Sequence, residues 1–286
     1  MAGIRWGISD YMIINDRLEN LKSIIKSYES VFVAFSGGVD STFLLKVAHE
    51  VLGDKCVAIN VESDFVPERE ENEARVFCEN EGIRWIGIKC DILDYKHITA
   101  NPENRCYLCK KTLFSEMLQI MEHEGFNALL EGSNMDDTLD YRPGMKAVKE
   151  LGVKSPLEDA KLSKQEIREL SKDMGLPTWN KPSFACLATR FVYGEEITKE
   201  KLKKVEAAEQ FLIDKGFTQV RVRIHGESLV RIEVSENKLE ELFSIRKEVT
   251  DRLKSIGFTY ITMDMTGYRT GAMNEVRGYY GKKTIS

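Results

Sequence analysis

The alternation of short apolar runs with amphipathic stretches in the first half of the chain constrains the fold most. The apolar runs are expected to form strands and cover residues 31–35, 56–61, 84–89 and 128–132. Helical periodicity precedes and separates them, over residues 16–28, from the turn after residue 35 to residue 51, over 67–82 and over 106–124. Buried strands that alternate with helices indicate an α/β fold with a doubly wound parallel sheet. Such a sheet binds ligands beyond the carboxyl ends of its strands.

The order of predicted helices and strands changes near Val192, where the second half of the chain begins. This half predicts a helix over residues 198–215, two strands at 219–225 and 229–234, a helix over 238–255 and a strand over 258–265. This order suggests a smaller α+β domain with an antiparallel sheet. We therefore expect two domains, residues 1–185 and residues 186–286. The non-periodic segment 177–190 carries Cys186, and we interpret it as a functional loop.

Composition narrows the class of protein. No apolar run among the 286 residues approaches the length of a membrane span, and the first residues lack the features of a signal peptide, so we expect a cytoplasmic protein. The net charge is -5, and it is uneven: it is negative over residues 1–186 and positive over residues 187–286. Because a nucleic-acid-binding surface has to be basic, we expect neither a nucleic acid nor a membrane as a partner.

The sharpest motif follows the first predicted strand, where a Gly-Gly turn leads into a helix. Glycines let the backbone approach a phosphate, and the N–H groups at a helix start point toward it. The two serines add hydroxyl donors, and Asp40 can hold Mg²⁺. The glycines alone would fit a plain helix entry, but the full hexapeptide resembles the PP-loop of ATP pyrophosphatases. The residues expected to hold the pyrophosphate of ATP are Ser36, Gly37, Gly38, Val39, Asp40 and Ser41.

A second polar segment, EGSNMDD at residues 131–137, follows the fourth predicted strand. Similar segments lie near the nucleotide in NAD synthetases, GMP synthetases and tRNA thiolases. We expect Gly132, Asn134 and Asp137 to contact ATP, and Asp136 or Asp137 to share the metal of Asp40. A water-exposed turn rich in Asp and Asn is the alternative.

The six cysteines are expected to be reduced, so metal or catalytic roles outrank disulfides. Cys106 and Cys109 open a predicted helix and lie on one face of it, and Cys186 comes from the functional loop. Three thiolates can hold a [4Fe–4S] cluster with one iron left open. A structural zinc, a redox pair and plain buried thiols remain as alternatives. Cys56 and Cys78 fit core positions, and Cys90 has no assigned role.

Strand 219–225 alternates, so Arg221 and Arg223 point to the same face. With Arg190 they could grip a phosphate monoester, or they could form ion pairs with acids such as Glu233. Glu209 falls within the apolar stripe of the 198–215 helix and therefore needs a partner. That partner is expected to be Arg221, Arg223 or a metal ion such as Mg²⁺.

Taken together, the chain resembles the LarE family, the ATP-dependent sulfur transferases that build the nickel-pincer cofactor of lactate racemase. The motifs SGGVDST, NRCYLCKKTLF, EGSNMDD, DYRPG, CLATR and RVRIHG occur in the order typical of that family. The resemblance implies a PP-loop (adenine nucleotide α-hydrolase-like) domain and the substrate pyridinium-3,5-biscarboxylic acid mononucleotide. It places Cys186 at the sulfur-donor position and favours phosphate binding by the arginines. It also implies a [4Fe–4S] cluster on the three cysteines, and a homo-oligomer, often a hexamer.

The resemblance implies a two-step reaction. A substrate carboxylate first attacks the α-phosphate of Mg²⁺·ATP, which gives an acyl-adenylate and pyrophosphate. Sulfur from the cluster or from Cys186 then displaces AMP and leaves a thiocarboxylate, and the cycle repeats at the second carboxylate. A PP-loop tRNA thiolase is the main alternative, ahead of an amide-forming synthetase and a non-catalytic nucleotide- or metal-binding module.

Overall fold

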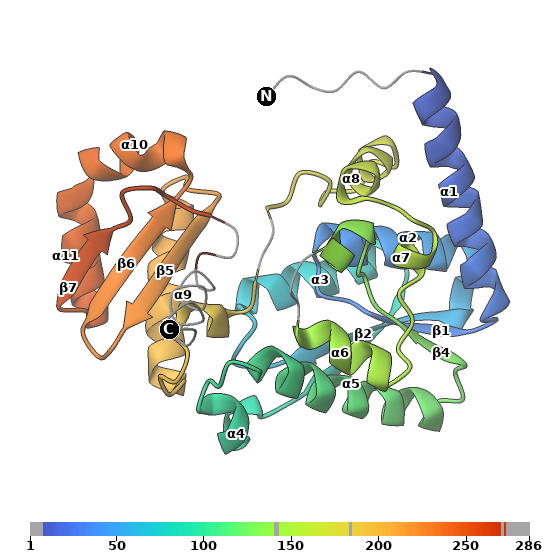
Figure 1. Ribbon diagram of the computed structural model, residues 1–286, viewed down its shortest axis with the longest axis horizontal. Coiled ribbons are helices and arrows are strands. Elements are labelled where there is room, and N and C mark those ends of the chain that lie inside the picture. Colours follow the sequence, from blue (N-terminus) through green and yellow to red (C-terminus); the bar gives the residue numbers. More distant parts are fainter. Residues whose placement is uncertain (1–7, 140–142, 183–184, 270–271, 273–286) are drawn as a thin grey trace, which may run out of the picture. The chain divides into compact units, whose positions relative to one another are not determined.

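The computed structural model describes residues 8–139, 143–182, 185–269 and 272, which divide into two compact units (Figure 1). The first unit comprises residues 1–90 and 104–184, and the second comprises 91–103 and 185–286. The expected domain of residues 1–185 included 91–103, but this segment groups with the second unit. The reason is local hydrogen bonding: the Asn101 side chain donates to the Val192 carbonyl at 2.7 Å, and Ile197 N–H donates to the Thr99 carbonyl at 2.8 Å.

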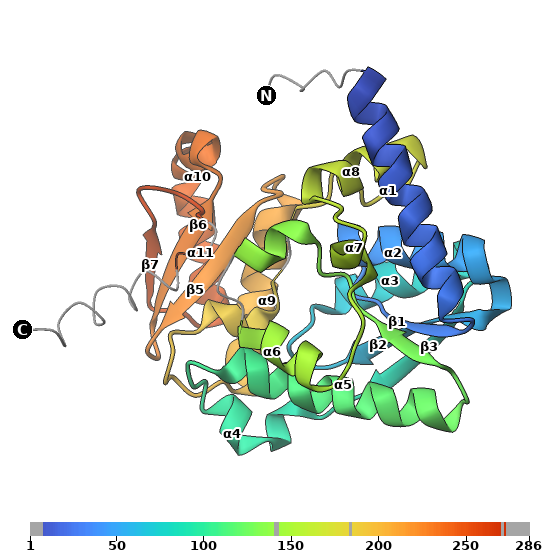
Figure 2. The same cartoon turned by 45° about the vertical axis from the view of Figure 1, so that its right-hand side comes forward.

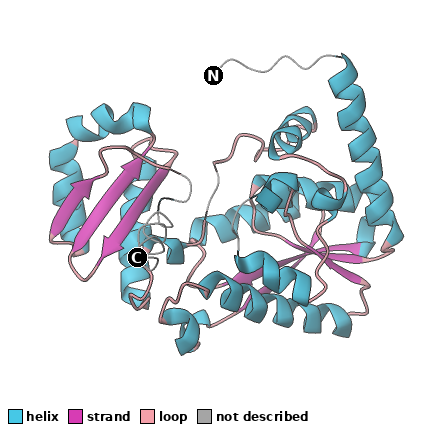
Figure 3. Cartoon of the chain, in the orientation of Figure 1, coloured by secondary structure: helices cyan, strands magenta, loops and turns pink. Residues whose placement is uncertain are grey.

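The first unit is built on a four-stranded sheet in the order β3-β2-β1-β4, with every pair parallel (Figure 3). The strands are β1 (Val31–Ala34), β2 (Cys56–Glu62), β3 (Arg84–Lys89) and β4 (Ala128–Leu130). The predicted parallel sheet is therefore confirmed, with a fourth strand shorter than expected. Val31 of the central strand β1 pairs in register with Cys56 on one side and with Ala128 on the other.

Helices cover both faces of this sheet in Figures 1 and 2. The helices of the first unit are α1 (Ile8–Ser27), α2 (Val39–Leu52), α3 (Glu68–Glu81), α5 (Arg105–His123), α6 (Pro143–Glu150), α7 (Pro156–Asp159) and α8 (Lys164–Asp173). Val31 and Val33 of β1 pack with α1, α2 and α8 in the main core. Phe32 points to the other face, where its ring lies 4.7 Å from that of Phe126, which follows α5. Alternate residues of one buried strand thus serve two helical layers.

The second unit packs helices against a three-stranded sheet in the order β5-β6-β7. Its elements are α4 (Lys96–Thr99), α9 (Lys199–Asp214), β5 (Val220–His225), β6 (Leu229–Val234), α10 (Leu239–Ser244), α11 (Arg246–Ile256) and β7 (Tyr260–Met263). The expected antiparallel sheet is right for β5 and β6 but wrong for β7, which runs parallel to β6. The two helices α10 and α11 form the crossover that a parallel pair requires. They stand where one helix was expected.

Short 3-10 helices complete the fold: η1 (Gly53–Lys55), η2 (Ile92–Asp94), η3 (Met135–Leu139), η4 (Leu187–Arg190) and η5 (Glu236–Lys238). Within the described ranges, no helix combines the length and the apolar character needed to cross a membrane.

Candidate functional site

The phosphate loop joins the carboxyl end of β1 to the start of α2. Gly37 has a φ of +68°, a left-handed conformation that glycine adopts without strain, and Gly38 precedes the first turn of α2. No side chain of the described residues caps this end of α2. The loop therefore has the geometry of an anion site, in which the amide N–H groups of a helix start face the ligand.

The two serines of the loop meet each other. Their hydroxyl oxygens are 3.1 Å apart, and Ser36 N–H donates to Ser41 Oγ at 3.3 Å. Ser41 Oγ in turn donates to the Gly38 carbonyl at 3.2 Å. The loop thus closes on itself and brings its two hydroxyl groups together.

Asp40 has the environment expected of a metal ligand. Its Oδ2 contacts Lys164 Nζ, whereas its Oδ1 is buried and has no hydrogen-bond partner in the described structure. Burial raises the pKa of Asp40, and the nearby Asp137 carboxylate raises it further, while Lys164 opposes the rise. A buried carboxylate oxygen beside a second carboxylate fits a hard cation such as Mg²⁺.

Residues 132–137 lie against the first turn of α2. A Cβ on Gly132 would come within 3.1 Å of the Ser41 nitrogen, so glycine is needed for this approach. Asn134 N–H donates to Asp137 Oδ2 at 3.1 Å, and Asp136 N–H donates to Asn134 Oδ1 at 3.0 Å. The segment is indeed a turn rich in Asp and Asn. However, Asn134 and Asp137 are buried beside the phosphate loop and are not exposed to water.

Two lysines that the sequence analysis did not single out also contact the phosphate loop. Lys164, 124 residues from Asp40 in sequence, begins α8 and contacts the Asp40 carboxylate. Lys181 Nζ donates to the Gly37 carbonyl at 3.1 Å and to Glu70 at 2.6 Å. The Ser163–Glu166 capping signature marks the start of α8 in the sequence, but it does not reveal that Lys164 lies beside Asp40.

The cysteines occupy two kinds of environment. Cys106 and Cys109 lie in the first two turns of α5 and are partly exposed, and Arg105 Nη2 donates to Cys106 Sγ at 3.7 Å. Cys186, in the second unit, is also partly exposed and immediately precedes η4. The buried cysteines are Cys56, Cys78 and Cys90.

These environments fit the donor set expected for an iron–sulfur cluster. Burial raises the pKa of Cys56 and of Cys78 to about 12, which keeps both thiols protonated, and their predicted place in the core is confirmed. Among the described residues, no three His, Cys, Asp or Glu side chains already form a metal-binding group. The cluster on Cys106, Cys109 and Cys186 therefore stays a prediction.

Arg190 holds the segment around Cys186. It is fully buried, and its Nε and Nη2 each donate to Glu209 at 2.8 Å. Its Nη1 donates to the carbonyls of Ala185 at 2.5 Å and Cys186 at 3.0 Å, and to Thr189 Oγ1 at 3.0 Å. Glu209 thus pairs with Arg190, a partner that the sequence analysis did not name. Phosphate binding by Arg190 would compete with these contacts.

The two strand arginines differ from each other. Arg223 forms a two-pronged pair with Glu233 at 3.0 and 2.8 Å, and its Nη1 donates to the Thr189 carbonyl at 2.9 Å. Arg221 donates to the Val220 carbonyl at 2.7 Å and lies over the Tyr268 ring. Burial, and next the charge of Arg190, lowers the pKa of Arg221 to about 10.

Several charged side chains are buried inside the second unit. Its buried charged side chains, within the described part of the chain, are three arginines and two glutamates: Arg190, Arg221, Arg223, Glu209 and Glu233. Burial is the main cause of the low pKa of Arg221, and the neighbouring positive charge of Arg190 lowers it further.

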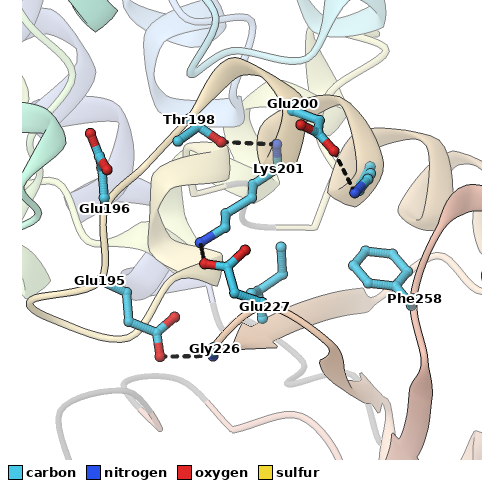
Figure 4. Close-up of a pocket in the computed structure, with 10 residues that line it drawn as sticks. Glu195, Glu196, Thr198, Glu200, Lys201, Gly226, Glu227 and Phe258 are labelled. Atoms are coloured by element: carbon cyan, nitrogen blue, oxygen red, sulfur yellow. Dashed lines mark hydrogen bonds and ion pairs between the residues drawn. The ribbon is translucent and has the colours of Figure 1, made fainter.

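A cavity of about 310 Å³ also opens in the second unit, at the start of α9 (Figure 4). Thr198 caps α9 there, and Lys201 pairs with Glu227 at 2.7 Å. None of the residues that line this cavity is a site residue predicted from the sequence.

Known proteins resemble this chain over most of its length. The sequence model of the NAD synthase family matches residues 13–107. An uncharacterised protein of Synechocystis is 40% identical over 92% of this chain and 99% of its own length. The pyridinium-3,5-bisthiocarboxylic acid mononucleotide synthase of Lactiplantibacillus plantarum is 37% identical over 89% of this chain and 92% of its own length. A component of the glutamine-hydrolysing GMP synthase of Thermoplasma volcanium is 28% identical over 70% of this chain and 67% of its own length.

Proposed function

This chain belongs to the LarE family of ATP-dependent sulfur transferases, and on that premise we propose that it synthesises pyridinium-3,5-bisthiocarboxylic acid mononucleotide. The substrate would be the corresponding biscarboxylic acid mononucleotide, an intermediate of the nickel-pincer cofactor of lactate racemase. The observation that carries the proposal is the phosphate loop at residues 36–41. It joins an uncapped helix start to an unpartnered, buried oxygen of Asp40.

In the first step, the phosphate loop holds the outer two phosphates of ATP. The hydroxyls of Ser36 and Ser41 and the N–H groups at the start of α2 donate to the phosphate oxygens. Asp40 and Asp137 would hold Mg²⁺, which neutralises the charge of the phosphates. A substrate carboxylate attacks the α-phosphorus, the bond to the β-phosphate oxygen breaks, and pyrophosphate leaves. Gly132 and Asn134 line the nucleotide beside the loop.

In the second step, sulfur replaces AMP on the activated carboxyl. A thiolate at Cys186 attacks the acyl carbon, AMP leaves with the electron pair of the broken C–O bond, and a thioester to Cys186 remains. Loss of the Cα proton of that residue and cleavage of its Cβ–Sγ bond then release the thiocarboxylate and leave dehydroalanine in the chain. Adenylation is required because a carboxylate oxygen is a poor leaving group, whereas AMP is a good one. A [4Fe–4S] cluster held by Cys106, Cys109 and Cys186 would supply sulfide as the nucleophile and would spare the Cys186 sulfur. Arg190 fixes the carbonyls of Ala185 and Cys186 and so orients that cysteine.

Arg221 is the candidate ligand of the substrate phosphate, supported by the positive charges of Arg190 and Arg223 close to it. Arg190 and Arg223 are each paired with a buried glutamate, and they contribute to phosphate binding through the electrostatic field of their charges. In this proposal residues 1–185 supply the ATP chemistry and residues 186–286 supply substrate binding and the contacts of a homo-oligomer, a hexamer by analogy with the family.

The test is an anaerobic assay that follows pyrophosphate and thiocarboxylate separately. Wild-type protein should release pyrophosphate only when the pyridinium biscarboxylate is present, and should form the thiocarboxylate. Cys186→Ala should lose thiocarboxylate formation but keep part of the pyrophosphate release, because it changes only the second step. Full sulfur transfer by Cys186→Ala would refute the role of that cysteine. Pyrophosphate release that depends on tRNA would favour a tRNA thiolase instead.

A further inference from the structure

We propose that Lys164 exchanges between two partners during ATP binding. It neutralises Asp40 before the nucleotide arrives, and it turns to the outer phosphates of ATP when Mg²⁺ takes its place on Asp40. The inference rests on the proposed ATP chemistry and adds Lys164 to it as a phosphate-binding residue. The juxtaposition that carries it is the contact of Lys164 Nζ with Asp40 Oδ2, beside a second oxygen of Asp40 that has no partner in the described structure.

The main chain of Lys164 is anchored, so only its side chain is free to move. Ser163 and Glu166 form a capping box at the start of α8, and Arg17 donates to both oxygens of Glu166 at 2.7 and 2.9 Å. Lys164 N–H donates to Asp136 Oδ2 at 2.9 Å. The side chain of Lys164 therefore contacts the phosphate loop, and its backbone contacts residues 132–137. A four-carbon stem on a fixed backbone can reorient without disturbing either element.

The charges around Asp40 make Mg²⁺ and Lys164 competitors. Mg²⁺ binds carboxylate oxygens directly, and it would use the same carboxylate that Lys164 now contacts. Two cations at one carboxylate repel each other, so the metal displaces the ammonium group. The outer phosphates of ATP offer it a new anionic partner close to the same loop. Lys164 should thus oppose binding of a metal alone and favour binding of a nucleotide that has β- and γ-phosphates.

This exchange has a signature that a structural role lacks. Loss of a structural lysine would weaken every ligand of the site together. Loss of an exchanging lysine should strengthen the binding of the metal, weaken ATP and leave AMP unaffected, since AMP lacks the outer phosphates. The affinities of one variant for the metal, ATP and AMP therefore distinguish an exchanging lysine from a structural one.

The experiment compares Lys164→Met with wild type and with Lys172→Met, which removes an exposed lysine from the other end of the same helix. Calorimetry measures ATP with Mg²⁺ and AMP, and electron paramagnetic resonance measures Mn²⁺ alone. The Mn²⁺ site is identified as the one that Asp40→Asn abolishes. A charge-assisted hydrogen bond corresponds to about a tenfold change in affinity or more. We expect Lys164→Met to bind Mn²⁺ about tenfold more tightly and ATP about tenfold more weakly, with AMP unchanged. Lys172→Met should match wild type for all three.

Lys164→Arg provides a second variant in case Lys164→Met does not fold. A guanidinium can grip the Asp40 carboxylate with two parallel hydrogen bonds and should release it less readily. Lys164→Arg should therefore bind Mn²⁺ more weakly than wild type, a change opposite in sign to that of Lys164→Met.

Three results would overturn the inference. Equal losses of ATP and AMP in Lys164→Met would indicate a structural role, and unchanged Mn²⁺ and ATP affinities would indicate no role. Unchanged Mn²⁺ affinity in Lys164→Arg would exclude competition at Asp40. If wild type binds ATP normally in these cases, only the exchange is wrong. If wild type binds no ATP at all, the proposed function fails with it.

Discussion

At the scale of single residues, the cysteines form a buried group and a partly exposed group, which are expected to differ in reactivity. Cys56, Cys78 and Cys90 are packed inside the first unit, whereas Cys106, Cys109 and Cys186 reach its surface or that of the second unit. A thiol must be ionised to act as a metal ligand or a nucleophile. Since burial raises the pKa of Cys56 and Cys78 to about 12, these two thiols stay protonated at neutral pH and are poorly suited to sulfur chemistry.

This division predicts a labelling pattern. Iodoacetamide at pH 8, applied to the native protein freed of metal, should modify Cys106, Cys109 and Cys186 and spare the three buried cysteines. Burial blocks access to all three, and the raised pKa also keeps Cys56 and Cys78 protonated. Peptide mass spectrometry reads the sites, and labelling of all six in denaturant serves as the control. Rapid native labelling of Cys56 or Cys78 would contradict the assignment of the core.

A second residue-scale prediction concerns Glu209. Its carboxylate pairs with Arg190 and also accepts a hydrogen bond from Val222 N–H at 2.8 Å. Glu209→Gln leaves a buried guanidinium without its counter-charge, so it should lower the free energy of unfolding by about 3–5 kcal/mol.

Urea denaturation followed by circular dichroism measures this loss. Glu227→Gln is the matched control, because its side chain is 83% exposed and its pair with Lys201 should matter by less than about 0.5 kcal/mol. If Glu209→Gln had unchanged stability but lost a bound metal, Glu209 would be a metal ligand.

At the scale of elements, the proposed ATP site is built from two segments that meet at the carboxyl ends of neighbouring strands. Residues 36–41 follow β1, and residues 131–137 follow β4, which is hydrogen-bonded to β1. The parallel register brings both loops to one edge of the sheet. Gly132 of the second loop lies close to the backbone of Asp40 and Ser41 in the first.

The approach at Gly132 predicts the effect of adding a methyl group. In Gly132→Ala the new Cβ would press on the Ser41 backbone, which cannot yield easily, so ATP affinity should fall and stability should fall by about 1–3 kcal/mol. Calorimetry and thermal melting measure the two effects.

Gly38→Ala is the comparison, because its Cβ would meet only Ser36 Oγ, at an ordinary 3.5 Å. It should weaken ATP binding, since a phosphate must approach Gly38 closely, yet leave stability nearly unchanged. Equal stability of the two variants would show that the loops are not tightly packed.

Elements also show where sequence patterns stop being informative. The four parallel strands and the loop at Ser36 follow from apolar runs and glycine chemistry, which are local. The parallel direction of β7 does not, because α10 and α11 look like one helix in the sequence and either strand direction fits the same apolar pattern. The grouping of residues 91–103 with the second unit likewise depends on hydrogen bonds such as that from Asn101 to Val192.

At the scale of the whole molecule, the proposed chemistry draws on both units. The phosphate loop, Cys106 and Cys109 belong to the first unit, and Cys186 with the buried arginines belongs to the second. Neither unit alone carries a complete set of the proposed cluster ligands. A cluster would therefore depend on cysteines from each.

Iron analysis tests this dependence. Protein purified without oxygen should contain about four irons and four sulfides per chain and absorb broadly in the blue. Cys106→Ala and Cys186→Ala, one from each unit, should each lose most of this iron, whereas Cys78→Ala should retain it. Retention of full iron by Cys186→Ala would exclude that cysteine as a ligand, and zinc in place of iron would exclude the cluster.

The sequence by itself determined the parallel sheet, the phosphate loop and the identity of the three candidate cysteines, because strand periodicity, glycine conformation and thiol chemistry are properties of short segments. Only the tertiary structure decided that Lys164 contacts Asp40, that Glu209 pairs with Arg190, and that Asn134 and Asp137 are buried. Such contacts join residues far apart in the chain. Their partners are selected by the burial of charge, which no local pattern records.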